Sequence, residues 1–269
     1  MHKEAEPVLL DALQMARRNH LRTDEGKILN NLGIVYVVQA KYDLALDFNF
    51  QALQIRERED DGPEIAATLH NIGFVYYKLM DFNKALAYYK ESLRLKRTVK
   101  DDYVLDILLV NISLCHAYLK NFSVAKLYLD IAVAVGGQKQ FNEDFQTNAN
   151  FCLGIIHAGL NQSNEAQMYF LRSYQFALKM NDIRYQLDNI SRVSDVYIAR
   201  NETSKAISYL TIAEHLIIAG ATYNLEMINI YEKFSLLYHK TNDYKNAALY
   251  QQKYIQLKDS IHSEKVTRN

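Results

Sequence analysis

The stretch NIGFVYYKLMDFNKALAYY, residues 71–89, contains the pattern that decides the fold. The small residue Gly73 is followed by Ala85 after twelve positions and by the aromatic Tyr88 after fifteen. This pattern occurs six times, at intervals of 40 or 41 residues. Its small residues, which we call anchors, are Gly33, Gly73, Ser113, Gly154, Ser194 and Ser235. The alanines are Ala45, Ala85, Ala125, Ala166, Ala206 and Ala247, and the aromatics are Phe48, Tyr88, Tyr128, Tyr169, Tyr209 and Tyr250. A fixed period of this length predicts stacked supersecondary units rather than one globular core.

Each repeat has the hydrophobic periodicity of two amphipathic helices. In the first repeat, Leu32 and Val35 lie on one helical face, and Leu44 and Phe48 continue the pattern after residues 41–43. The corresponding interruptions in the other repeats are short and rich in cap-forming residues. So short a connection predicts an antiparallel helical hairpin. The anchor and the alanine have a common cause, because two helices approach closely only where the side chains at their crossing are small.

These residues resemble the tetratricopeptide repeat, whose first helix carries Leu-Gly-x-x-Tyr and whose second carries Ala-x-x-Tyr/Phe followed by Ala. The first-helix core reads Leu32-Gly33…Tyr36 and Ile72-Gly73…Tyr76, with looser versions at Leu153-Gly154…His157, Val193-Ser194…Tyr197 and Leu236…Tyr238. The second-helix core reads Ala45…Phe48…Ala52, Ala85…Tyr88-Tyr89…Ser92 and Ala206…Tyr209…Ala213. The tryptophan common near the start of the first helix is absent, because the chain has none.

The period of about 40 residues is similar to the subfamily found in kinesin light chain and in bacterial signalling proteins. In those bacterial proteins the array precedes a sensor kinase or a DNA-binding output domain. The resemblance implies an all-α fold, a right-handed α-solenoid of stacked antiparallel helix hairpins.

The repeat register also predicts the domain organisation. Because Ala5 lies forty residues before Ala45, residues 1–22 are expected to form a leading half repeat that consists of a second helix only. The six hairpins are expected at about 23–60, 63–99, 102–137, 140–180, 182–220 and 222–261, followed by a polar connector at 262–269. A leading helix without its hairpin partner leaves apolar surface uncovered. We therefore expect either a cut from a longer protein or a partner on this face, including a homodimer through the N-terminal helix.

Composition limits the classes of partner and the compartment. The 31 basic and 31 acidic residues balance, so no global field favours direct binding of nucleic acid. The longest apolar runs, such as 104–110, are too short to span a membrane, and the first residues lack the segments of a secretory signal. Cys115 and Cys152 are expected to be buried thiols rather than a disulfide. The composition favours the cytoplasm and leaves the periplasm open if the parent protein carries an export signal.

No motif for catalysis, cofactor binding or metal binding is present in the sequence. His116 and His157 lie at or beside the recurrent tyrosine position of consecutive repeats, where a metal pair can be imagined. No acidic ligand accompanies them, so packing histidines are the preferred interpretation. We predict that the chain is not an enzyme and carries no cofactor.

The candidate binding residues form a polar ladder, because the residue two positions before each anchor reads Asn31, Asn71, Asn111, Cys152, Arg192 and Lys233. The resemblance implies that this face of the first helices lines a concave groove. The first three rungs would span about 20 Å and match about six residues of an extended peptide, whose backbone the amides can bind. Further candidate groove residues are Asn30, His70, Phe74 and Lys78, and Tyr77, which lies off the core stripe. Arg192 and Lys233 could receive an acidic group.

The alternative is that the asparagines bond to neighbouring repeats and fix their stacking, and that Arg192 pairs with Asp195 or Asp188. On the first interpretation, the chain is a scaffold that binds a protein or peptide segment in its groove, as the sensory or regulatory region of a bacterial signalling protein. A peptide-pheromone receptor array and a stand-alone assembly scaffold are the alternatives.

Overall fold

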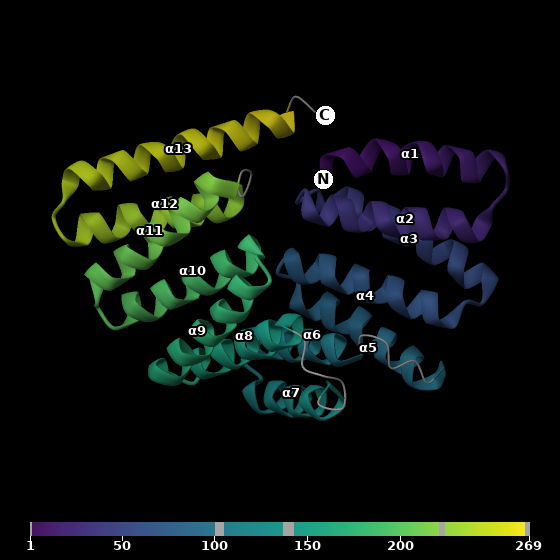
Figure 1. Ribbon diagram of the computed structural model, residues 1–269, viewed down its shortest axis with the longest axis horizontal. Coiled ribbons are helices and arrows are strands. Elements are labelled where there is room, and N and C mark those ends of the chain that lie inside the picture. Colours follow the sequence, from purple (N-terminus) through teal and green to yellow (C-terminus); the bar gives the residue numbers. More distant parts are fainter. Residues whose placement is uncertain (1, 100–104, 137–142, 221–223, 267–269) are drawn as a thin grey trace. The chain divides into compact units, whose positions relative to one another are not determined.

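The computed structural model describes residues 2–99, 105–136, 143–220 and 224–266. This part of the chain contains thirteen α-helices and no strand (Figure 1). The helices are α1 (His2–Arg18), α2 (Arg22–Val38), α3 (Tyr42–Glu59), α4 (Gly62–Lys78), α5 (Phe82–Val99), α6 (Leu105–Tyr118), α7 (Phe122–Gly136), α8 (Glu143–Gly159), α9 (Ser163–Lys179), α10 (Ile183–Ala199), α11 (Thr203–Gly220), α12 (Asn224–Lys240) and α13 (Tyr244–Val266). The predicted all-α class is therefore confirmed.

The helices pair as six hairpins, which divide between two compact units. Unit 1, residues 1–140, contains α1 and the hairpins α2/α3, α4/α5 and α6/α7. Unit 2, residues 141–269, contains the hairpins α8/α9, α10/α11 and α12/α13. We call the first helix of each hairpin the A helix and the second the B helix. Within each unit the B helix of one hairpin packs on the A helix of the next, as α3 does on α4 and α9 on α10.

The turn inside each hairpin depends on one residue in the left-handed helical region, seven positions after the anchor. These residues are Ala40, Met80, Lys120, Asn161, Asn201 and Asn242, with φ between 55° and 62°. At the α4–α5 turn the N–H groups of Met80 and Asp81 donate to the carbonyls of Tyr77 and Tyr76, both at 3.0 Å. These bonds satisfy the last carbonyls of the A helix in a Schellman motif. The carboxylate of Asp81 then accepts from the N–H of Lys84 at 3.1 Å and caps α5.

Two rings stack in every hairpin, one from each helix. The A-helix ring comes three positions after the anchor, and the B-helix ring is the aromatic predicted fifteen positions after it. The six pairs have ring centroids 5.0 to 5.6 Å apart: Tyr36–Phe48, Tyr76–Tyr88, His116–Tyr128, His157–Tyr169, Tyr197–Tyr209 and Tyr238–Tyr250. The alanines three positions before the B-helix rings are buried, five of them completely. Small alanines and stacked rings therefore fix the crossing of each hairpin.

Each anchor faces a residue sixteen positions later, on the B helix. A β-carbon on Gly73 would come within 2.7 Å of the Tyr89 ring, and one on Gly154 within 2.4 Å of the Phe170 ring. Gly33 likewise faces Asn49, with 2.4 Å between its β-carbon position and Oδ1, and the residues sixteen positions after the serine anchors are Leu129, Leu210 and Gln251. The Ser113 hydroxyl donates to the carbonyl of Ala125 at 2.6 Å. The small anchor thus makes room for its partner on the B helix.

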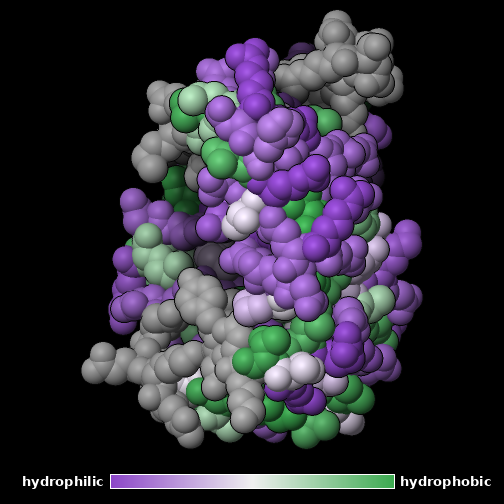
Figure 2. Space-filling model, turned by 90° about the vertical axis from the view of Figure 1, so that its right-hand side faces the viewer, coloured by the Kyte–Doolittle hydropathy of each residue, from purple (hydrophilic) through white to green (hydrophobic). Residues whose placement is uncertain are grey.

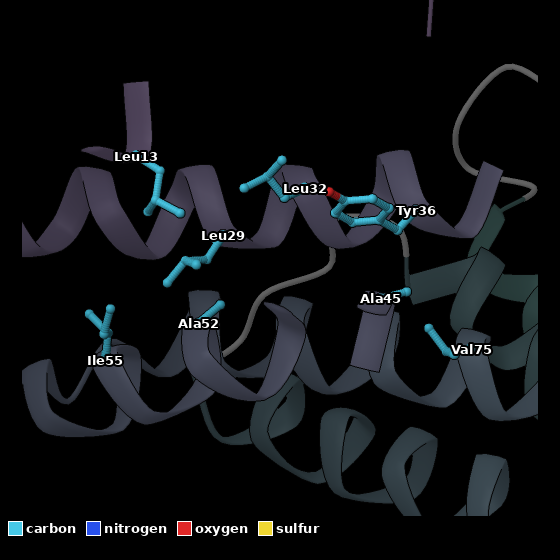
Figure 3. Packing of buried hydrophobic residues seen from close by; sticks show 8 residues of the cluster. All are labelled: Leu13, Leu29, Leu32, Tyr36, Ala45, Ala52, Ile55 and Val75. Carbon is cyan, nitrogen blue, oxygen red and sulfur yellow. The ribbon is translucent and has the colours of Figure 1, made fainter. Parts of the chain in front are cut away.

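The leading helix α1 packs against the first hairpin, as expected for a second helix of a preceding repeat. Leu13 of α1 joins a buried cluster with residues of α2, α3 and α4, such as Leu29, Ile55 and Val75 (Figure 3). On the opposite side of α1, Val8 is 67% exposed and Met15 63% exposed. Dimerisation through this face stays a prediction.

The other end of the chain differs from the expected boundary. Helix α13 continues to Val266, so residues 262–266 of the predicted connector are helical. The physical reason is that residues 244–266 contain no proline or glycine to stop the helix.

Candidate peptide-binding site

The A helices of unit 1, α2, α4 and α6, carry eight of the ten predicted groove residues. Asn31 on α2, Asn71 on α4 and Asn111 on α6 occupy the same register, two positions before their anchors. Asn31 is exposed, whereas Asn71 and Asn111 are half-buried. The accessibility of the three amides therefore differs, although the sequence pattern treats them alike.

Hydrogen bonds between successive A helices account for the burial of Asn71 and Asn111. The Asn71 Nδ2 donates to Asn30 Oδ1 at 2.9 Å, and Asn111 Nδ2 lies 2.9 Å from His70 Nε2. Each bond joins the residue three positions before one anchor to the residue two positions before the next anchor. The stacking role, which the sequence offered as the alternative, is thus present for these two asparagines.

The bond between Asn111 and His70 requires a neutral imidazole when the amide nitrogen is the donor. Burial, with a smaller contribution from the positive charge of Lys96, lowers the pKa of His70 to about 4. The imidazole is therefore neutral at pH 7, and its Nε2 can accept the hydrogen bond.

A buried arginine continues this polar network and was not among the predicted residues. Arg56, at the end of α3, is 4% exposed and forms an ion pair with Glu64 of α4. Its Nη1 donates to the carbonyl of Glu64 at 3.0 Å, bonds to the Thr68 hydroxyl and lies 3.5 Å from Asn30 Oδ1. Burial lowers the pKa of Arg56, and Glu64 opposes this effect. The sequence signal was available, because Arg56 and the buried Lys96 both stand 23 positions after an anchor.

Apolar side chains lie beside the polar ladder. Ile34 and Val38 on α2 are 46% and 45% exposed, at the positions three and seven residues after Asn31. On α4 the same two positions are Phe74 and Lys78, and the Lys78 ammonium lies 5.6 Å from the centre of the Phe74 ring. The face of α2 and α4 therefore combines amides and apolar groups with the cations Lys27 and Lys78.

Tyr77 was predicted to lie off the core stripe, and the structure places it in a half-buried aromatic cluster. Its ring centre is 6.2 Å from Phe74, 5.9 Å from Phe82 and 6.0 Å from Tyr118. The rings of Phe82 and Tyr118 stack at 4.7 Å. Tyr77 thus packs the ends of α4, α5 and α6 together and remains partly accessible.

The two remaining predicted residues, Arg192 on α10 and Lys233 on α12, belong to unit 2. Both face Asp195, whose carboxylate lies 3.7 Å from Arg192 Nη1 and 2.6 Å from Lys233 Nζ. Lys233 also donates to the Ser191 hydroxyl at 2.9 Å, which repeats the register of the Asn71–Asn30 bond. Burial lowers the pKa of Lys233, and Asp195 opposes this effect. The two cations therefore already have a counter-ion from the protein.

The histidines considered for a metal pair take part in ring stacks instead. His116 stacks on Tyr128 at 5.6 Å and His157 on Tyr169 at 5.0 Å. Among the residues that the structure describes, no three His, Cys, Asp or Glu side chains are grouped as metal ligands. Cys115 and Cys152 are both buried thiols, as predicted. Within the same residues, no helix combines the length and apolar character that a membrane span requires.

Comparison with protein families identifies the repeat. Models of the tetratricopeptide repeat match residues 24–98, 64–138 and 228–260, which together make up more than half of the chain. The chain belongs to the tetratricopeptide repeat family. No curated protein that was compared with the sequence matches it.

Three solved structures illustrate the likeness of this tetratricopeptide array to known folds. NprR in complex with its cognate peptide NprX matches with a TM-score of 0.72 at 15% identity, over 97% of this chain and 78% of that one. The apo form of RapI matches with a TM-score of 0.66 at 18% identity, over 94% of this chain and 92% of that one. Aspartyl phosphate phosphatase F from Bacillus subtilis matches with a TM-score of 0.62 at 17% identity, over 88% of this chain and 60% of that one. At these identities the matches show the fold, an α-solenoid of tetratricopeptide hairpins.

Proposed function

We propose that this chain is a peptide-binding regulatory scaffold and that the A-helix face of unit 1 holds the peptide. The observation that carries the proposal is the combination, on α2 and α4, of the exposed amide of Asn31 with the partly exposed apolar side chains of Ile34, Val38 and Phe74. An amide can donate to and accept from a peptide backbone, while neighbouring apolar groups receive its side chains. The NprR structure, solved with its cognate peptide, supports peptide binding by a fold of this kind.

The chemistry of this face defines the expected ligand. Lys78 lies beside Phe74 on α4, and the exposed Lys27 stands four residues before Asn31 on the same face of α2. We therefore expect an extended segment with apolar side chains and an acidic side chain or carboxylate near Lys78. Asn71 and Asn111 orient neighbouring residues through their bonds to Asn30 and His70, so Asn31 is the amide that is available to the ligand.

The experiment that tests the proposal screens the full chain against a library of synthetic peptides of about six residues, the length that three rungs span. Binding is measured by fluorescence anisotropy, with small-angle scattering to detect a change of radius. Asn31→Ala should weaken the best peptide about fivefold or more and leave the unfolding free energy unchanged. Asn83→Ala, an exposed asparagine on the B helix α5, is the matched control. The proposal fails if no library member binds, or if both variants bind equally well.

The wider role in the proposal is the sensory or regulatory region of a bacterial signalling protein. The support from known folds is that NprR was solved with a cognate peptide, which is the kind of ligand that a regulatory array of this fold would bind. The sequence that flanks residues 1 and 269 in the parent gene distinguishes this role from its alternatives. A kinase or DNA-binding segment supports the signalling role, whereas its absence favours a stand-alone assembly scaffold.

A further inference from the structure

The outer face of α7 carries four apolar residues, whereas the equivalent faces of α3, α5, α9, α11 and α13 carry one each. Val124 is 39% and Leu127 57% exposed, Ile131 is half-buried and Ala134 is exposed. Their spacing of three and four residues places them in one stripe along the helix. We call this set the α7 stripe. Figure 2 shows a face on which hydrophilic side chains predominate, with hydrophobic side chains gathered near its bottom.

The other hairpins show that the repeat does not need apolar residues there. Forty residues before the α7 stripe, α5 carries Lys84, Ala87, Glu91 and Arg94. Forty-one residues after it, α9 carries Glu165, Met168, Arg172 and Gln175. Packing within the array therefore does not explain the α7 stripe, and exposed apolar surface of this kind marks interaction sites.

The neighbouring B helix in unit 1 is strongly basic. Helix α5 contains five basic residues and one acidic residue, Glu91, which pairs with Arg94 at 2.6 Å. Lys90, Arg94 and Arg97 are exposed and line a shallow depression together with Leu93 and Thr98. We call these three cations the α5 row. The α5 row covers about 10 Å of helix and the α7 stripe about 15 Å, so each matches two to three turns of a bound helix.

We propose that the α7 stripe and the α5 row together dock an acidic amphipathic helix of a partner protein. Its apolar face would cover Leu127 and Ile131, and its acidic border would face Lys90 and Arg97. Charge complementarity argues for this occupant, because the α5 row is positive and one acidic residue on the helix offsets only Arg94. In an antiparallel pair of two copies of this chain, the two α5 rows would face each other and repel. This surface lies on B helices and is separate from the proposed peptide site on A helices.

The test uses a labelled synthetic helix of about fourteen residues, with leucines on one face and glutamates along one border. A second probe replaces the glutamates with lysines. By fluorescence anisotropy on the full chain, the acidic probe should bind at least about tenfold more tightly than the basic probe and weaken as salt is raised. Leu127→Ser, which copies Ser208 of the fifth hairpin, should weaken it about tenfold.

Three further variants make the result decisive. Lys90→Glu combined with Arg97→Glu should reverse the preference between the probes. Met168→Ser, the position of Leu127 in the fourth hairpin, should leave binding unchanged, as should Asn31→Ala on the A-helix face. Equal binding of both probes, or unchanged binding by Leu127→Ser, overturns the proposal. So does a dimer in sedimentation that Leu127→Ser dissociates, because a second copy would then be the occupant.

Discussion

Gly73 lies against the ring of Tyr89, so close that a β-carbon on the glycine would come within 2.7 Å of two ring carbons. Tyr89 is completely buried, and its ring therefore cannot move aside into solvent. In the third and fifth hairpins the two positions of Gly73 and Tyr89 hold serine and leucine instead, as Ser113 with Leu129 and Ser194 with Leu210. In these hairpins a glycine anchor thus accompanies the tyrosine and a serine anchor accompanies leucine, as expected for side chains that share one space.

This complementarity predicts a strong energetic coupling between Gly73 and Tyr89. Gly73→Ser should cost about 1–3 kcal/mol of unfolding free energy by overpacking. Adding Tyr89→Leu recreates the Ser113–Leu129 pair, so the double variant should be more stable than the sum of the single effects by at least about 1 kcal/mol. Urea unfolding of the natural chain, the two single variants and the double variant measures this coupling free energy. Additive effects would show that the two positions do not share the contact.

Met80 occupies the left-handed position of the α4–α5 turn with φ of 60° and is 71% exposed. Asn161, Asn201 and Asn242 hold the same position in unit 2, and asparagine adopts this conformation more readily than methionine. Met80→Asn should therefore stabilise the chain by about 0.5–1 kcal/mol. The reverse change, Asn161→Met, is the matched control and should destabilise it by a similar amount. Thermal unfolding of both variants checks the prediction, and a loss of stability in Met80→Asn would contradict it.

Asn49 lies sixteen positions after its anchor and is completely buried, and neither of its side-chain amide atoms has a hydrogen-bond partner. Leucine, similar in shape, occupies this position in the third and fifth hairpins. Because an unsatisfied buried polar group is costly, Asn49→Leu should raise the unfolding free energy by about 1–2 kcal/mol. Asn189→Leu is the comparison, since the Nδ2 of Asn189 donates to the Tyr185 carbonyl at 2.7 Å. Chemical denaturation should give the smaller gain, or a loss, for Asn189→Leu.

The sequence predicted the contacts inside a repeat better than those between repeats. The anchor, the alanine and the B-helix aromatic recur at fixed offsets, so their shared crossing follows from helical geometry, and the ring stacks confirm it. The bond of Asn71 to Asn30 joins side chains 41 residues apart, and its existence depends on the stacking offset of two hairpins. Nothing in the spacing alone distinguished an amide that faces a ligand from one that faces the next helix.

Buried polar residues were the other limit of sequence reasoning. Arg56 and Lys96 are each followed by a charged residue, Glu57 or Arg97, near the ends of their helices, where basic residues are common on exposed surfaces. The burial of Arg56 follows from the next A helix, which supplies Glu64 and Thr68 as its partners. The signal for this burial in the sequence was that the position 23 residues after the anchor holds a cation in two hairpins, Arg56 and Lys96.

The histidine at the stack position of the third hairpin predicts an acid-sensitive step in stability. His116 is buried with neither ring nitrogen bonded, and burial, with a smaller contribution from Lys90, lowers its pKa. The unfolded chain, with a histidine pKa near 6.5, then binds more protons than the folded chain below that pH. Stability is therefore fully present above about pH 6.5 and is lost as the pH falls, by at most about 1.4 kcal/mol per pH unit for this group. His70, whose folded pKa is about 4, adds a loss of the same sign down to that value.

His116→Tyr separates the two contributions, because tyrosine fills the stack position in the first, second, fifth and sixth hairpins. The variant should keep the stack on Tyr128 and lose less unfolding free energy between pH 7.5 and pH 5 than the natural chain does. Urea unfolding at both pH values gives the loss of unfolding free energy in each protein. Because His70 and the carboxylates are present in both, their contributions cancel when the two losses are subtracted. An identical pH dependence in the two proteins would show that His116 has the same pKa in the folded and the unfolded chain, contrary to the lowered folded pKa.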